Sequence, residues 1–71
     1  MDEFKITIAA ARVNARKTQA DVAAALHIGK QTVVSWETGK TSPTVEKAQE
    51  FCQFCNIPFD RVTFLREHNA I

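Results

Sequence analysis

Residues 27–29 (HIG) interrupt a helical pattern of apolar residues for only three positions. Before the interruption, Val22 and Leu26 lie four residues apart, and after it Val33 and Trp36 restore the three-residue step. Two short helices joined by so tight a turn cannot lie antiparallel. We therefore expect them to cross at a large angle, so that the second helix stands out from the body of the domain.

The rest of the chain has the same helical spacing, with no strand-like alternation. A chain of 71 residues, 45% hydrophobic with only two glycines and two prolines, is long enough for one hydrophobic core and is not disordered in composition. We predict a single all-α domain over residues 1–71, a compact five-helix bundle that contains a helix-turn-helix. The expected helices lie at about residues 3–15, 18–26, 30–38, 43–55 and 58–65.

Capping residues mark several of these boundaries. Thr18 offers a hydroxyl N-cap to the second helix, with Asp21 as the acid of a capping box. Gly39 stands where glycine usually follows the last turn of a helix. Ser42 and Pro43 predict an N-cap and a first-turn proline for the fourth helix.

A buried face can be predicted for every helix from its apolar residues. Trp36 is expected to fill the crevice between the second, third and fourth helices. The other predicted core residues include Phe4, Ile8, Ala11, Ala15, Val22, Ala23, Leu26, Val33, Val45, Ala48, Phe51, Cys52, Cys55, Phe59 and Val62.

The charge distribution favours an anionic partner. The net charge is only +1, but residues 12–41 carry five basic and two acidic side chains, a net +3. No apolar run reaches the ~18 residues that a membrane span needs, and the N-terminal residues lack the order of a signal peptide. We expect a cytoplasmic protein that does not bind membranes.

Catalysis, cofactor binding and metal binding are not expected. Cys52 and Cys55 have no further cluster of ligand residues nearby, so they are predicted to be reduced and buried, with an exposed redox switch as the alternative. His27 and His68 fall in a turn and a tail, and Ser35 has no neighbouring base. No glycine-rich phosphate loop is present.

Residues 19–38 resemble a helix-turn-helix, and residues 5–65 as a whole resemble the Cro and phage-repressor type of the XRE family. The string WETGK followed by TSPT is similar to the end of the family's recognition helix. Arg12 and Glu37 match a family pair in which an arginine of the first helix binds a glutamate before the glycine. The resemblance implies a partly buried, bidentate ion pair. The alternative is that Arg12 is a solvated helix residue.

Two positions in the turn depart from the family pattern. His27 stands where the family usually has a glycine in a left-handed conformation, which histidine tolerates at a cost. Gly29 stands where serine or threonine commonly caps the recognition helix, and glycine is also an acceptable N-cap. These departures affect the turn more than the helices.

The resemblance implies a sequence-specific DNA-binding transcriptional regulator whose third helix lies in the major groove of double-stranded DNA. The matching base-reading residues are Lys30, Gln31, Thr32, Val34 and Ser35. The matching phosphate-binding residues are Arg16, Lys17, Gln19, Thr38 and Lys40. A homodimer on a pseudo-palindromic operator is expected, because one small module buries little surface on DNA.

Two alternatives remain open at this stage. The surplus of C-terminal apolar residues, Phe54, Phe59, Phe64 and Leu65, fits either a homodimer surface or the core. The low charge of the reading face also fits a protein-interaction module that modulates a partner repressor through its helix-turn-helix face. Val34, the C-terminal phenylalanines and Trp36, if exposed, would anchor that partner.

Overall fold

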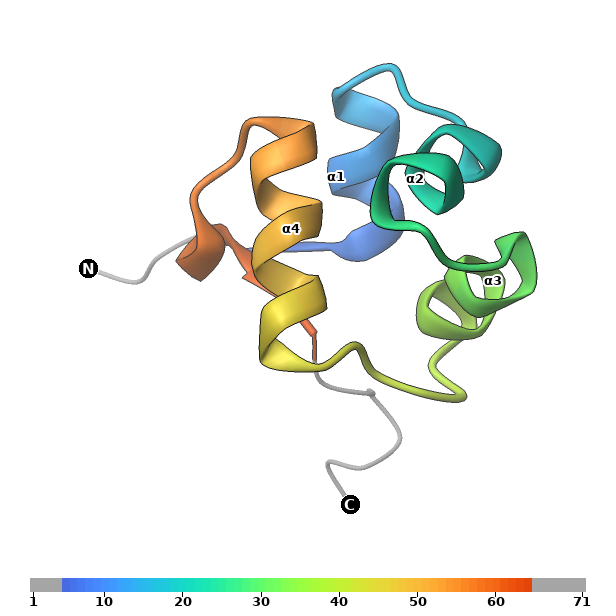
Figure 1. Ribbon diagram of the computed structural model, residues 1–71. Coiled ribbons are helices and arrows are strands. Elements are labelled where there is room, and N and C mark those ends of the chain that lie inside the picture. Colours follow the sequence, from blue (N-terminus) through green and yellow to red (C-terminus); the bar gives the residue numbers. More distant parts are fainter. Residues whose placement is uncertain (1–4, 65–71) are drawn as a thin grey trace.

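The computed structural model describes residues 5–64, and four α-helices lie within this range (Figure 1). In chain order the elements are β1 (Ile6–Thr7), α1 (Ile8–Asn14), α2 (Gln19–Leu26), α3 (Lys30–Thr38), α4 (Val45–Cys55), the 3-10 turn η1 (Phe59–Arg61) and β2 (Val62–Thr63). The chain is therefore mostly helical, as predicted. The fifth helix is not present in the described residues.

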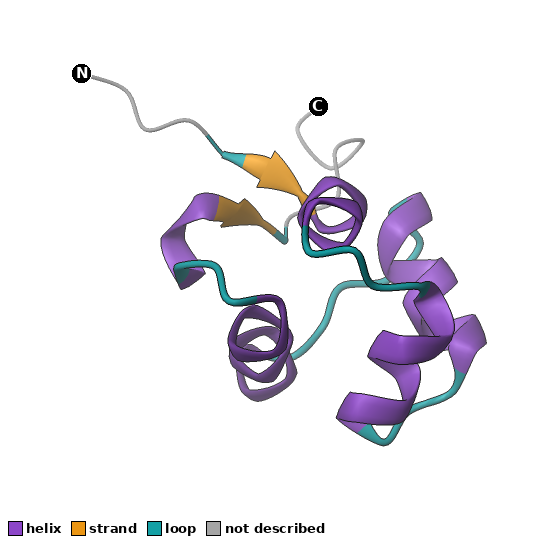
Figure 2. Ribbon diagram, turned by 90° about the horizontal axis from the view of Figure 1, so that it is seen from above, coloured by secondary structure: helices purple, strands orange, loops and turns teal. Residues whose placement is uncertain are grey.

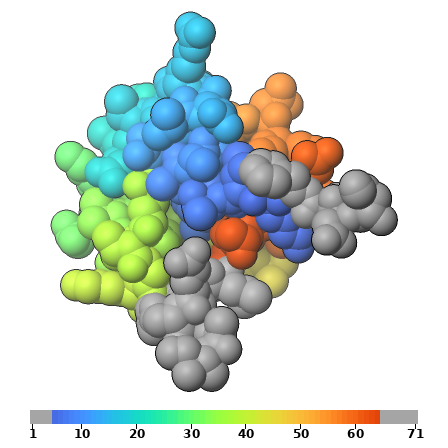
Figure 3. Space-filling view, turned by 180° about the vertical axis from the view of Figure 1, so that it is seen from behind, coloured from blue at the N-terminus to red at the C-terminus, as the bar shows by residue number. Residues whose placement is uncertain are grey.

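The core lies where the four helices meet. Phe51, Leu26, Val22 and Val33 are its largest fully buried side chains. Helices α2 and α3 pack directly on each other, and α2 also packs on α4. In Figure 1, α3 lies at the edge of the molecule, away from η1 and the strands. In the view from behind, α1 (blue) lies between the helix-turn-helix (cyan to green) and the segment that follows α4 (orange to red) (Figure 3).

The prediction that the first helix starts at residue 3 was wrong for residues 5–7. Ile6 and Thr7 form β1, which pairs in parallel with β2, so that Ile6 lies opposite Val62 (Figure 2). β-branched residues favour this extended backbone. The Thr7 hydroxyl then accepts a hydrogen bond from the Ala10 N–H at 3.1 Å and begins α1 one residue later. The predicted core residue Phe4 lies outside the described residues.

The predicted helix at residues 58–65 was also wrong. Only the three residues of η1 are helical, and Val62 and Thr63 continue as β2. Val62 and Thr63 are β-branched, and they can pair with the edge of β1. The backbone is therefore extended here, although the apolar spacing predicted a helix. Val62 still enters the core, as expected, but Phe59 is 44% exposed. Leu65 lies outside the described residues.

The fourth helix begins two residues later than predicted. Thr44, and not Ser42, is its N-cap, and the Thr44 hydroxyl accepts a hydrogen bond from the Lys47 N–H at 3.2 Å. Pro43 therefore precedes the helix. Val45, which was expected in the core, is 67% exposed because it lies in the first turn, whereas the other predicted core residues of α4 are buried.

The turn between α2 and α3 contains a strained residue. His27 ends α2 in the left-handed conformation, with φ 59° and ψ 45°. A side chain costs free energy in this region and glycine does not. We expect His27→Gly to raise the free energy of unfolding by about 0.5 to 1 kcal/mol, after allowing for the greater freedom of glycine in the unfolded chain. Urea unfolding followed by circular dichroism measures this, and a lower stability would contradict it.

Candidate nucleic-acid interface

The first six residues of α3 include the five predicted base-reading residues. Lys30, Gln31 and Thr32 are exposed, and Val34 and Ser35 are half-buried. Val33 and Trp36 of the same helix are buried and anchor it. Three of the five predicted base-reading residues are thus exposed on a helix that Val33 and Trp36 fix in the core, and the other two are only partly accessible.

An ion pair between α1 and the last turn of α3 fixes the far end of this helix. Arg12 Nε lies 2.6 Å from Glu37 Oε2, and Arg12 Nη2 lies 3.3 Å from Glu37 Oε1. The two side chains are only 16% and 9% exposed. This fork-to-fork geometry allows one orientation of the carboxylate. Arg12 is therefore part of the packed structure.

Two further contacts complete the network around this pair. Arg12 Nη1 donates to the Lys17 carbonyl oxygen at 2.9 Å, which holds the loop before α2. Gln19 Nε2 donates to Glu37 Oε1 at 3.0 Å. The Glu37 carboxylate therefore joins α1, α2 and α3. Sequence reasoning did not find the Gln19 contact, because nothing in the spacing of the two residues indicates that the start of α2 reaches the end of α3.

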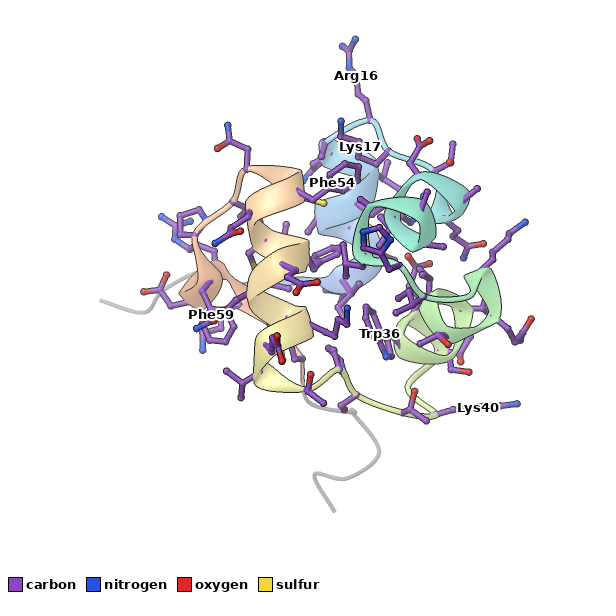
Figure 4. The ribbon with its side chains drawn as sticks, in the orientation of Figure 1. Arg16, Lys17, Trp36, Lys40, Phe54 and Phe59 are labelled. Atoms are coloured by element: carbon purple, nitrogen blue, oxygen red, sulfur yellow. The ribbon has the colours of Figure 1, made fainter. Side chains whose placement is uncertain are left out.

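The predicted phosphate-binding residues lie in several different environments. Arg16 is exposed, has a left-handed backbone with φ 63°, and points away from the body of the molecule (Figure 4). The Lys17 ammonium lies 4.7 Å from the centre of the Phe54 ring, a cation–π distance. Lys40 is exposed and extends outward from the loop after α3.

Gln19 and Thr38 already have partners within the protein. The Thr38 hydroxyl donates to the Ser35 carbonyl at 3.3 Å. The Gln19 side-chain nitrogen carries two hydrogens, so one can reach a phosphate while the other bonds to Glu37. Gln19, Thr38 and Lys40 thus lie at or just after the end of α3, whereas Arg16 lies in the loop between α1 and α2.

The beginning of α2 is fixed by a capping box. The Thr18 hydroxyl accepts from the Asp21 N–H at 3.0 Å, and the Asp21 carboxylate accepts from the Thr18 N–H at 2.8 Å. The hydrogen bond from the Thr18 backbone is the main reason why the pKa of Asp21 lies below its ordinary value. Gly39 ends α3 with φ 83°, a conformation that favours glycine.

A helix-turn-helix family model matches residues 8–62. The chain belongs to the XRE family of helix-turn-helix proteins. Its members are DNA-binding regulators, and the match supports this coarse function for the chain. A comparison with curated proteins gave no match.

The acidic side chains and the two cysteines bear on a metal site and on a redox switch in this XRE-family fold. Among residues 5–64, no group of three or more His, Cys, Asp or Glu side chains is placed to hold a metal ion. Cys52 and Cys55 are free thiols in the core, and burial raises the pKa of both. Raised pKa values oppose the reactivity that a redox switch needs. Within residues 5–64, every helix falls short of the length and hydrophobicity that a membrane span requires.

Proposed function

We propose that this chain is a sequence-specific transcriptional regulator that reads DNA through α3 in the major groove. The observation that carries the proposal is the exposed start of α3, on a helix whose last turn is fixed by the Arg12–Glu37 pair. Lys30 can donate to guanine O6 and N7, and Gln31 can bond in a bidentate manner to adenine N6 and N7. The Ser35 hydroxyl can hydrogen-bond to guanine or to adenine, and Thr32 and Val34 flank these contacts.

Phosphate contacts would set the register of α3 on the duplex. We assign them to Arg16, Lys17, Gln19, Thr38 and Lys40, which lie before and at the start of α2 and at and after the end of α3. For Lys17 the assignment requires that its ammonium leave the Phe54 ring. Each neutralised phosphate adds about −0.9 to the slope of log affinity against log salt concentration. A slope of several units is therefore expected.

The functional unit is proposed to be a homodimer on a pseudo-palindromic operator, in the manner of Cro and phage repressors and in the cytoplasm. One domain covers too little DNA for strong operator choice. The exposed Phe59, which stacks on Phe64 with ring centres 5.6 Å apart, is a candidate for the contact between subunits. Phe54 and Phe64 pack against the core and contribute less to such a contact.

Selection from a randomised duplex pool tests the proposed function. We expect enrichment of a palindrome, and we expect Gln31→Ala to lose about 1 to 3 kcal/mol of binding free energy to the selected duplex because the bidentate adenine contact is lost. The change should be smaller on a scrambled duplex. Fluorescence anisotropy at two salt concentrations measures both.

Gln53→Ala is the matched control, since Gln53 is an exposed glutamine of α4. Equal losses in the two variants would contradict base reading by Gln31. Enrichment of a single half-site would contradict the dimer. No enrichment at low salt would favour the second candidate function, a module that modulates a partner repressor. The half-buried Val34 and the exposed Phe59 support that candidate, whereas Trp36 is buried and cannot anchor a partner.

A further inference from the structure

A lysine of α4 reaches the helix-turn-helix at its turn. Lys47 Nζ lies 2.8 Å from the carbonyl oxygen of Leu26, the last residue of α2. The same ammonium lies 3.2 Å from Glu50 Oε1, one turn further along α4. Lys47 is half-buried. Its ammonium lies between the Leu26 carbonyl of α2 and the Glu50 carboxylate of α4.

The position of this contact matters because the end of α2 determines where α3 starts. The last carbonyls of a helix have no partner within the helix. The His27 and Ile28 N–H groups satisfy those of Ala23 and Ala24. The Leu26 carbonyl instead receives Lys47, a cation at the negative end of the α2 dipole.

Lys47 therefore joins α4 to the turn, at the end of the helix-turn-helix opposite to the Arg12–Glu37 pair. That pair holds the last turn of α3. Only three residues separate Leu26 from Lys30, the first residue of α3. A shift of the Leu26 carbonyl relative to α4 must therefore move the start of α3, where the proposed base-reading residues lie.

We propose that Lys47 is a positioning residue for base recognition, which fixes the start of α3 through the Leu26 carbonyl and makes no contact with DNA itself. The inference rests on the proposed function. It predicts that loss of the ammonium weakens binding to the selected sequence more than binding to any other duplex. A phosphate contact would instead weaken binding to all sequences alike.

The test compares Lys47→Met, which keeps a long apolar side chain but removes the donor, with Lys47→Arg, which keeps a charged donor. We expect Lys47→Met to lower the ratio of affinities for selected and scrambled duplexes about three- to tenfold, the range of one ordinary hydrogen bond, because the partly exposed ammonium is screened by solvent. Lys47→Arg should restore most of that ratio. The salt slope should stay at the wild-type value.

Glu50→Gln is the matched control, because it removes the ion pair on α4 and leaves the contact with Leu26. It should bind like the wild type. All variants are measured at a temperature at which circular dichroism shows them to be fully folded. Hydrogen exchange of the Ile28 N–H, which bonds to the Ala23 carbonyl at 3.0 Å, reports on the turn in the same samples.

Each other outcome overturns the inference. A salt slope reduced by about 0.9 in Lys47→Met would identify a phosphate contact. Faster exchange of the Ile28 N–H with an unchanged affinity ratio would show a purely structural role. Both results leave the proposed function intact. If the wild-type protein itself enriches no sequence, the proposed function and this inference fail together.

Discussion

Trp36→Ala is expected to lower the free energy of unfolding by about 3 to 5 kcal/mol, the usual cost of removing a large buried aromatic side chain. Trp36 is 8% exposed and lies between α3 and α4 (Figure 4). It is one of only two buried residues of α3, so its loss removes much of what attaches α3 to the domain. Domains of this size are only marginally stable, so a large part of the variant should be unfolded at 25 °C.

Urea unfolding followed by circular dichroism measures this effect without relying on the tryptophan. Val45→Ala is the control, because it also shortens an apolar side chain but at an exposed position of α4. It should change the free energy of unfolding by less than about 0.5 kcal/mol. A Trp36→Ala protein that is as stable as the wild type and binds the selected duplex equally well would show that Trp36 is not a core residue.

Arg12→Met should destabilise the domain by about 2 to 4 kcal/mol. The Glu37 side chain is only 9% exposed in the wild-type protein. After the substitution its carboxylate has no cation beside it, and Gln19 is its remaining side-chain hydrogen-bond donor. Breaking one side of a fully buried ion pair costs about 3 to 5 kcal/mol, and the partial exposure of Arg12 reduces that figure. The Lys17 carbonyl also loses its donor, so the loop before α2 should loosen.

A double substitution separates the loss of the pair from the cost of an unpaired charge. Arg12→Met combined with Glu37→Gln should recover about half of the lost stability, because no buried charge then remains unpaired. Arg16→Met is the control, since Arg16 is exposed and points into solvent. Equal stability losses in Arg12→Met and Arg16→Met would contradict a structural role for the pair.

The two corrections in which a predicted helix proved to contain a strand have one physical origin. Apolar spacing located all four helices, but it placed helix where the chain forms β1 and β2. The pairing of Ile6 with Val62 joins residues 56 positions apart. A short segment with β-branched residues can adopt either backbone conformation, and a distant partner strand decides which. Neither segment contains a local signal of that partner.

The exposure of Val45 shows the same limit at a helix end. Its spacing relative to Ala48 fits the buried face of α4, but the first turn extends beyond the elements that cover that face. Periodicity predicts which side of a helix is apolar, and it does not predict how far the neighbouring elements reach along the helix.

The sequence by itself determined the helix-turn-helix, the buried faces of α2 and α3, and the XRE-family resemblance, because these depend on local spacing, capping and short motifs. Only the tertiary structure decided which side chains meet across the fold: Gln19 with Glu37, Lys17 with Phe54, and Lys47 with the Leu26 carbonyl. Such contacts depend on how helices distant in the chain are oriented, and a long polar side chain has several partners within reach until that orientation is fixed.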